Sequence, residues 1–190
     1  MKELILGGVR SGKSSLAEGL AVESGLPVTY IATARGGDPE MQARIAHHRS
    51  RRPAHWELEE AGGDLAAVLT RLARPRHCLL VDCLTLWLTG IMAPVQAGPA
   101  GGELAEGGAE HQEPCREIEE LLAVLPNLPG RIIMVGNETG LGVVPMGVLT
   151  RRFCDESGRL HQRLAAICDR VILTVAGLPL VLKHRSPEDS

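Results

Sequence analysis

The chain has 190 residues, a formal net charge of −3 and four aromatic side chains, at Tyr30, Trp56, Trp87 and Phe153. This length suffices for one α/β domain with a proper core and is short for two, so we expect one domain over residues 1–190. Neither a broad cationic face nor a row of stacking rings is available, which argues against nucleic acid as a partner.

The cysteines and the hydropathy pattern predict a cytoplasmic location. The chain has five cysteines, an odd number without a C-x-x-C pair, at Cys78, Cys83, Cys115, Cys154 and Cys168. Such a set argues against a disulfide-bonded secreted domain, so we expect small buried thiols in a reducing cytosol. No segment approaches the roughly 18 apolar residues of a membrane span, and we therefore predict a cytoplasmic protein without one.

A strand, a glycine-rich loop and a helix come first along the chain. The apolar run 4–6 predicts a buried strand, and a helix is expected over 14–23. Between them the sequence matches the pattern G-x-x-x-x-G-K-[ST], with Gly7, Gly8, Val9, Arg10, Ser11, Gly12, Lys13 and Ser14. In this context backbone N–H groups surround a phosphate, Lys13 reaches the β/γ-phosphates and the Ser14 hydroxyl ligates Mg²⁺. The alternative is a chance glycine-rich turn, which the flanking strand and helix disfavour.

The next segments continue the alternation of strands and helices. A second strand is predicted over 28–32, followed by a loop around Gly36 and a helix from about Pro39, because proline suits a first helical turn. A short edge strand over 55–59 and a helix over 64–72 follow.

Two adjacent histidines lie in the basic segment 41–52. On a helix, His48 falls on the apolar face, whereas His47 lies opposite, with Arg44 three residues before it and Arg51 four residues after it. These cations can hold phosphates, and they disfavour the imidazolium form, which keeps the His47 ring neutral and nucleophilic near pH 7. From spacing alone, a solvated basic helix end with two idle histidines stays open as the alternative.

A buried strand is predicted over 78–82, and it ends in Asp82. In a protein with a phosphate-binding loop, an acid delivered by a neighbouring strand holds Mg²⁺ directly or through water. The alternative is that Asp82 caps the helix that follows.

The second half of the chain holds an irregular segment and three further elements. Residues 93–113 are rich in Gly, Ala, Pro and Glu without periodicity, which predicts a long flexible surface loop. Strands are predicted over 132–135 and 171–175, the latter closing the set, with a helix over 149–168 that Gly158 can interrupt. The apolar stripe of this helix consists of Leu149, Phe153, Leu160, Leu164 and Ile167.

These elements define the expected fold class. Continuously apolar strands that alternate with helices indicate a mostly parallel sheet covered on both faces, as in RecA-like P-loop NTPases. Ligands of such sheets bind at the carboxyl ends of the strands, where the candidate site residues lie.

Six motifs together resemble one known family, the bifunctional adenosylcobinamide kinase/adenosylcobinamide-phosphate guanylyltransferases of cobalamin biosynthesis. The resemblance covers nearly the whole chain and is far more specific than the phosphate-binding loop alone. The motifs are Gly-Gly-x-Arg-Ser-Gly-Lys-Ser at 7–14, Tyr-Ile-Ala-Thr at 30–33, Ala-Arg-Ile-x-His-His-Arg at 43–49, Arg-Pro-x-x-Trp at 52–56, Asn-Glu-x-Gly-x-Gly-x-Val-Pro at 137–145 and Gly-Arg-x-x-Gln-x-Leu-Ala at 158–165.

The resemblance implies two successive reactions. Adenosylcobinamide is first phosphorylated with ATP or GTP, and GMP from GTP is then transferred to the product, which gives adenosylcobinamide-GDP and pyrophosphate. In the family the first histidine of the pair carries the GMP, and this residue corresponds to His47. A monofunctional P-loop kinase or guanylyltransferase and a non-catalytic nucleotide-binding switch are the alternative functions.

The resemblance also implies site residues, a cofactor and an assembly. The nucleotide site would comprise the loop 7–14 together with Ala32, Thr33, Ala34, His48, Arg49, Ser50, Arg51, Glu60 and Asp82. Mg²⁺ is the implied cofactor, with Ser14 and Asp82 as its ligands, and the implied assembly is a homo-oligomer, a trimer in the family.

Four positions have an alternative interpretation or differ from the family pattern, and one of them, Glu60, belongs to this set. Glu60 lies in an acidic run, where a single acid is usually solvated. Asn137 and Glu138 are candidate corrinoid or metal contacts, with simple turn formation as the alternative. Gly136, just before them, departs from the family pattern, in which a residue such as threonine is expected.

Overall fold

The computed structural model describes residues 1–33, 53–92 and 116–185. The helix predicted from about Pro39, the pair His47 and His48, and the loop predicted over 93–113 lie outside these residues. The elements, in chain order, are β1 (Lys2–Gly7), α1 (Lys13–Glu23), β2 (Val28–Ala32), β3 (Glu57–Glu60), α3 (Leu65–Leu72), β4 (Cys78–Asp82), α4 (Leu84–Met92), α5 (Arg116–Val124), the short 3₁₀ helix η1 (Leu125–Asn127), β5 (Arg131–Asn137), α6 (Val148–Ile167), β6 (Arg170–Val175) and β7 (Leu178–His184).

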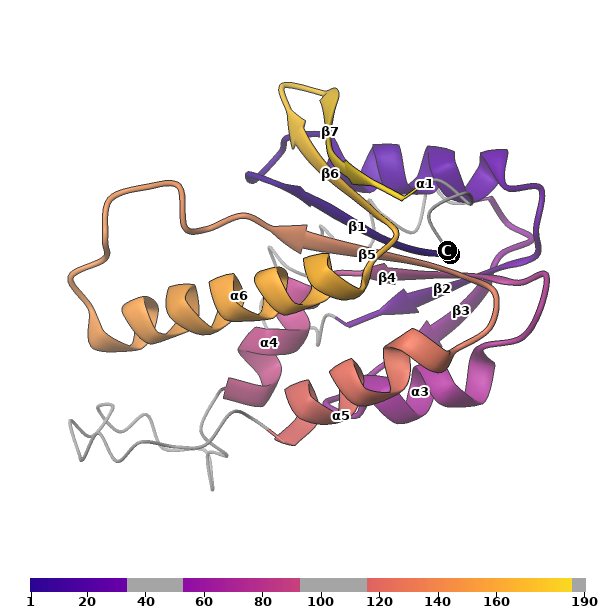
Figure 1. Cartoon of the computed structure of the whole chain (residues 1–190), viewed down its shortest axis with the longest axis horizontal. Helices are drawn as coiled ribbons and strands as arrows, with labels where there is room; N and C mark the ends of the chain where they lie inside the picture. Colours follow the sequence, from indigo (N-terminus) through magenta and orange to yellow (C-terminus); the bar gives the residue numbers. More distant parts are fainter. Residues whose placement is uncertain (34–52, 93–115, 186–190) are drawn as a thin grey trace.

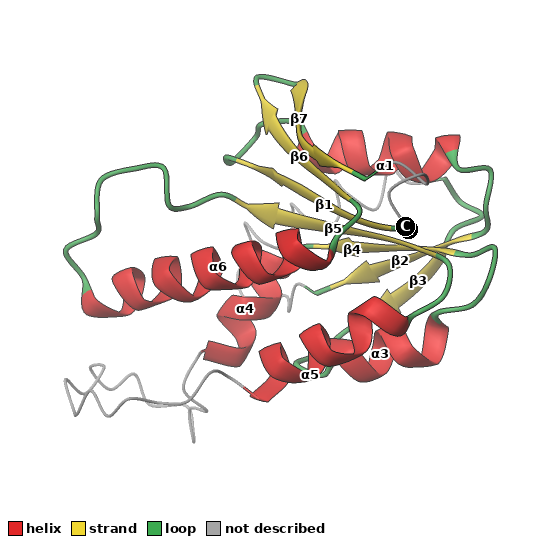
Figure 2. Ribbon diagram, in the orientation of Figure 1, coloured by secondary structure: helices red, strands yellow, loops and turns green. Residues whose placement is uncertain are grey.

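The described strands form one seven-stranded sheet in the order β3-β2-β4-β5-β1-β6-β7. Every neighbouring pair is parallel except β6 and β7, which form an antiparallel hairpin at one edge (Figure 2). One strand, β5, separates β1 from β4, which is the RecA-like order of P-loop folds. The predicted fold class is therefore confirmed.

Helices cover both faces of this sheet. Among the described helices α1 lies on one face, and α3, α4, α5 and α6 lie on the other (Figure 1). Side chains alternate along β5, so Ile132 and Met134 pack toward the second group of helices, while Ile133 and Val135 pack toward α1. Burial on both faces explains why the strands are continuously apolar in sequence.

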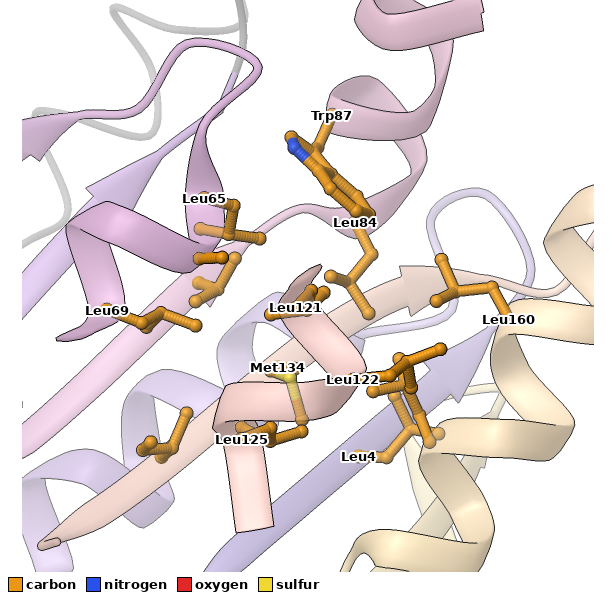
Figure 3. Packing of buried hydrophobic residues seen from close by; sticks show 14 of the residues in the cluster. Leu4, Leu65, Leu69, Leu84, Trp87, Leu121, Leu122, Leu125, Met134 and Leu160 are labelled. Carbon is orange, nitrogen blue, oxygen red and sulfur yellow. The ribbon is translucent and has the colours of Figure 1, made fainter. Parts of the chain in front are cut away.

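The larger hydrophobic cluster lies under α3, α4, α5 and α6. Trp87 and Leu84 of α4 pack there with leucines of α5 and with Met134 of β5 (Figure 3). The Trp87 indole N–H donates to the Gly63 carbonyl oxygen at 2.8 Å, so this buried ring has no unpaired donor.

Local signals explain several element bounds. Asp64 is the N-cap of α3, and its carboxylate accepts a hydrogen bond from the Ala67 N–H at 3.0 Å. Helix α6 continues through Gly158, so the predicted interruption is wrong. Of its predicted apolar stripe, Leu160 and Leu164 are buried, but Leu149 in the first turn is exposed.

Four elements were not predicted: α4, α5, the 3₁₀ helix η1 and β7. The prediction that the strand over 171–175 closes the set is wrong, because β7 follows it after a turn in which Ala176 and Gly177 have φ angles of 51° and 80°. The side chains of β7 are exposed on both faces except at Lys183, so this strand lacks the alternation of a half-buried strand.

Three of the five cysteines are buried free thiols, as expected. Burial raises the pKa of Cys78 to about 11 and that of Cys168 to about 12, and it also raises the pKa of Cys83. Cys154 is free and only partly buried, while Cys115 lies outside the described residues. Among the described helices, none is long and apolar enough to cross a membrane.

Candidate active site

The loop between β1 and α1 curls at the carboxyl edge of the sheet. Arg10 and Gly12 adopt left-handed conformations, with φ angles of 58° and 94°, and the Ser11 N–H donates to the Gly8 carbonyl oxygen at 3.2 Å. Glycine suits the second of these positions because it has no Cβ to clash in this region. Helix α1 then begins at Lys13, so its first N–H groups face the loop.

The β6–β7 hairpin supports this loop from the side. A Cβ at Gly7 would lie 2.4 Å from the Ser11 Oγ and 2.6 Å from the Thr174 carbonyl oxygen. A Cβ at Gly12 would lie 3.1 Å from the Gly177 Cα, and the Gly177 N–H donates to the Ser11 carbonyl oxygen at 2.8 Å. The two glycines thus permit close contact between the loop and a hairpin that is distant in sequence.

Lys13 is buried inside this loop, and its Nζ donates to the Gly8 carbonyl oxygen at 3.1 Å. Desolvation by burial lowers the pKa of Lys13, while the charge of Asp82 acts in the opposite direction. An ammonium group oriented by a backbone carbonyl and partly stripped of water strongly attracts a phosphate anion.

Asp82 and Thr33 come together at the ends of neighbouring strands. Asp82 is in register with Ala32, and its Oδ2 accepts a hydrogen bond from the Tyr30 hydroxyl at 2.9 Å. The Thr33 hydroxyl donates to the Cys83 carbonyl oxygen at 2.6 Å and accepts from the Cys83 N–H at 2.9 Å. These bonds hold the two strand ends together beside Lys13.

The donor set suits Mg²⁺ of the kind that accompanies a nucleotide. The described residues contain no group of three or more His, Cys, Asp or Glu side chains that could hold a metal ion. Mg²⁺ at phosphate-binding loops typically takes one or two protein ligands and completes its shell with phosphate oxygens and water. The Ser14 hydroxyl at the start of α1 and the Asp82 carboxylate fit that role.

The other predicted site residues are not all brought to the loop. Glu60 is exposed at the end of β3, four strand positions from β1, which corresponds to about 19 Å at ~4.8 Å per strand. The remaining predicted residues lie outside the described part of the chain, and these are Ala34, His47, His48, Arg49, Ser50 and Arg51.

The end of β5 lies directly beside the loop. The Glu138 N–H donates to the Gly7 carbonyl oxygen at 3.0 Å, and the Asn137 N–H donates to the Thr85 hydroxyl at 2.7 Å. The Glu138 Oε1 accepts from the Gly140 N–H at 2.7 Å, so this acid does form part of a turn. Its other oxygen, Oε2, faces the buried His161 ring of α6 at 3.7 Å from Nδ1.

Position 136 has little room for a side chain. A Cβ at this position would lie 2.9 Å from the His161 Nε2 and 3.2 Å from the Leu6 Cδ2. Sequence analysis did not single out His161, although a polar residue on a buried helical stripe next to Leu160 was an available signal.

The fold and the loop together define a P-loop nucleotide-binding protein of the α/β class. The chain belongs to the cobinamide kinase/cobinamide phosphate guanyltransferase family, which matches over residues 3–182. It is therefore a member of a bifunctional enzyme family, as the sequence motifs predicted, and the alternative of a non-catalytic switch is set aside.

Two relatives agree with this assignment, and a solved structure agrees with the fold. The chain is 56% identical over 183 residues to the bifunctional adenosylcobalamin biosynthesis protein CobP of Pseudomonas aeruginosa, covering 96% of this chain and 98% of that protein. It is 38% identical to the CobU protein of Salmonella typhimurium, covering 96% of this chain and all of that protein. A solved protein of Pyrococcus horikoshii aligns over 100% of this chain and 89% of its own, with 11% identity and a TM-score of 0.51, which reflects the fold alone.

Proposed function

We propose that the protein phosphorylates the hydroxyl group of adenosylcobinamide with ATP or GTP and then transfers GMP from GTP to the phosphorylated product. The family match over residues 3–182 is the observation that carries this proposal, because the family name states both activities. The 56% identity to a bifunctional adenosylcobalamin biosynthesis protein supports the same pathway. We further propose that the enzyme is a homo-oligomer.

In this proposal the loop 7–14 binds the triphosphate. Its N–H groups and the N-terminus of α1 receive phosphate oxygens, and the Lys13 ammonium lies against the β/γ-phosphates. Ser14 and Asp82 would hold Mg²⁺, which supplies charge neutralisation at the phosphates. Support comes from the burial of Lys13 and from its electrostatic contact with Asp82.

The other proposed nucleotide contacts follow β2 along the chain. Ala32 ends this strand in register with Asp82 and Thr33 follows it, which supports the assignment of both to the edge where the nucleotide binds. We assign Glu60 to the part of the nucleotide far from the phosphates, since it lies about four strands from β1 at ~4.8 Å each. The remaining assigned contacts are Ala34, His48, Arg49, Ser50 and Arg51.

We assign the covalent step to His47. A neutral imidazole nitrogen attacks the α-phosphorus of GTP, and pyrophosphate leaves. An oxygen of the corrinoid phosphate then attacks the same phosphorus, and the imidazole leaves. The covalent intermediate replaces one difficult displacement, in which the anionic corrinoid phosphate would attack the anionic GTP directly, by two easier steps. The position of His47 between Arg44 and Arg51 on one helical face is the sequence feature that supports this role.

Labelled GTP tests the proposal directly. With Mg²⁺ present, label from the α-phosphate should become covalently attached, survive base and be released by mild acid, as a phosphoramidate requires. Label from the γ-phosphate should leave nothing attached by this route. His47→Ala should abolish the adduct, whereas the matched variant His48→Ala should retain at least part of it. Normal labelling of His47→Ala would show that another residue is the nucleophile.

A further inference from the structure

A carboxylate that is not among the proposed nucleotide contacts directly follows β5. At the carboxyl edge of the described sheet, three strands end in or just before an acid: β3 at Glu60, β4 at Asp82 and β5 at Glu138. Asp82 accepts the Tyr30 hydroxyl and is assigned to Mg²⁺, and Glu60 is four strands from β1. Glu138 follows the strand that neighbours β1, and its N–H bonds to the Gly7 carbonyl oxygen at the start of the phosphate-binding loop.

The Glu138 carboxylate is fixed at one oxygen and available at the other. The Gly140 N–H donates to Oε1 at 2.7 Å, which sets the orientation of the group. Oε2 lies 3.7 Å from the His161 Nδ1, beyond hydrogen-bond distance, and the Glu138 side chain is 22% exposed. An ionised carboxylate with one open oxygen at this edge can accept a proton.

His161 is placed to act on that second oxygen. Its side chain is 8% exposed, and its Nδ1 has no hydrogen-bond partner among the described residues. The ring lies over Gly136, where a Cβ would come within 2.9 Å of Nε2, so the backbone of β5 makes room for it. A buried nitrogen without a partner is costly and therefore unusual, unless another state of the protein satisfies it.

The Glu138–His161 pair and α1 lie on opposite faces of the sheet. The contact between Glu138 and His161 of α6 lies on the face opposite α1, because α6 packs on the other side of the sheet from α1. A nucleotide bound by the loop lies at the N-terminus of α1. A hydroxyl at Glu138 would thus lie on the side of the phosphate-binding loop away from α1.

We propose that Glu138 is a catalytic residue of the phosphoryl-transfer step and that His161 is its positioning residue. This inference rests on the proposed function. The substrate hydroxyl gives its proton to the Glu138 carboxylate while its oxygen bonds to the γ-phosphorus. The bond from that phosphorus to the β,γ-bridging oxygen breaks, a nucleoside diphosphate leaves, and Glu138 later releases the proton to water. In the substrate-bound state the neutral His161 ring would move from 3.7 Å to hydrogen-bond distance, donate its Nδ1–H to Oε2 and keep the carboxylate oriented.

The proposed phosphorylation and the proposed GMP transfer differ in whether the acceptor must lose a proton, and this difference tests the role of Glu138. Proton removal is needed only for the alcohol, because the oxygens of cobinamide phosphate are already ionised near neutral pH. With cobinamide as acceptor, Glu138→Gln should lower the kcat of phosphorylation by about 100-fold or more. GMP labelling from GTP, and GMP transfer to added cobinamide phosphate, should stay within a few-fold of the parent. The exposed Asp155 of α6 provides the matched control, Asp155→Asn, which should change neither activity.

The role of His161 is tested by two substitutions. His161→Leu fills the buried space without a donor and should lower the kcat of phosphorylation while the KM for cobinamide and the GMP labelling stay near the parent values. His161→Asn keeps an N–H near the position of Nδ1 and should recover a large part of that kcat. A merely structural role would lower both activities together and would not be rescued by asparagine.

Three outcomes overturn the inference. They are phosphorylation by Glu138→Gln within a few-fold of the parent, equal loss of both activities in a folded Glu138→Gln protein, and an unchanged kcat in His161→Leu. If Glu138→Gln does not fold, Glu138→Asp takes its place, and the same differential between the two activities is required. Failure of the parent protein itself to phosphorylate cobinamide would contradict the proposed function as well, so the two failures are distinguishable.

Discussion

At the amino edge of the described sheet a buried carboxylate lies between two guanidinium groups, whereas at the carboxyl edge the buried side-chain groups that lack a hydrogen-bond partner among the described residues are neutral. Glu3, which is 0% exposed, accepts the Arg131 Nε–H at 2.6 Å. Its Oε1 lies 3.6 Å from the Arg170 guanidinium, and neither this oxygen nor the Arg170 Nε forms a hydrogen bond with the described residues. At the opposite edge, no described residue bonds the Ser11 hydroxyl, the Thr174 hydroxyl or the His161 Nδ1, all of them buried.

The difference shows that the amino ends of the strands mainly stabilise the sheet, whereas their carboxyl ends form the candidate site. The first residues of β1, β5 and β6 connect three strands through one buried carboxylate, which stabilises the strand order. The carboxyl ends of the same strands hold tight turns, a desolvated lysine and unsatisfied polar groups. Polar groups left without partners in the free protein are typical of a site that a ligand completes.

The largest effect is expected at the carboxyl edge, from Lys13→Ala. Removal of this charge should lower both phosphorylation and GMP labelling by about 100-fold or more. The melting temperature should stay the same or rise, because the buried ammonium is desolvated in the free protein. Activity assays and a thermal melt on the same sample check this. If GMP labelling stayed within a few-fold of the parent, GTP would not be held by this loop.

At the amino edge, Arg131→Met should lower stability and leave activity unchanged, which is the opposite of the result expected for Lys13→Ala. The Glu3 carboxylate would remain buried with Arg170 alone, so we expect the free energy of unfolding to fall by about 3 kcal/mol, with activity per folded molecule unchanged. Arg71→Met is the control, because the Arg71–Glu59 pair is exposed and should contribute less than about 1 kcal/mol. Urea unfolding of both variants measures the difference. Equal effects would remove the distinction between the edges.

A smaller effect is expected from Gly136→Ala. The added methyl group would meet His161 and Leu6, so the free energy of unfolding should fall by about 1–3 kcal/mol, and phosphorylation should slow as the His161 ring is displaced. Gly158→Ala is the matched control, since nothing lies within 4 Å of its Cβ and it is inside α6. That variant should gain roughly 0.5–1 kcal/mol. A stable, fully active Gly136→Ala protein would contradict the steric argument.

The smallest effect is a dependence of stability on pH. Burial lowers the pKa of His161, although the Glu138 charge acts in the opposite direction, and burial also lowers the pKa of His77. As the pH falls below about 6.5, these two histidines bind protons in the unfolded chain at a higher pH than in the folded protein. Stability is therefore present above this pH and decreases below it, by at most about 1.4 kcal/mol per unit for each ring. Urea unfolding of the parent and of His161→Asn across this range should show a flatter profile for the variant.

Local sequence patterns predicted most of the elements that position the site. The strands 28–32 and 78–82 are confirmed at both ends, because uninterrupted apolar runs flanked by turn formers have few other solutions in a compact fold. Helix α1 is also confirmed, beginning one residue before its predicted start. Helix α4 was missed because it is apolar around most of its circumference, so it lacks the amphipathic period that identifies a surface helix. Strand β7 was missed because nearly all of its side chains are exposed, so its sequence lacks the alternation of apolar and polar residues that identifies a half-buried strand.

The sequence by itself determined the phosphate-binding loop, the acid at the end of β4 and the family, since each depends on residues close together along the chain. Only the tertiary structure decided which distant groups surround the loop. Gly177 meets Gly12, Glu138 bonds to Gly7, and His161 fills the space left at Gly136. These contacts depend on strand order and register, which bring residues up to 165 positions apart to one edge of the sheet, and no local pattern encodes that proximity.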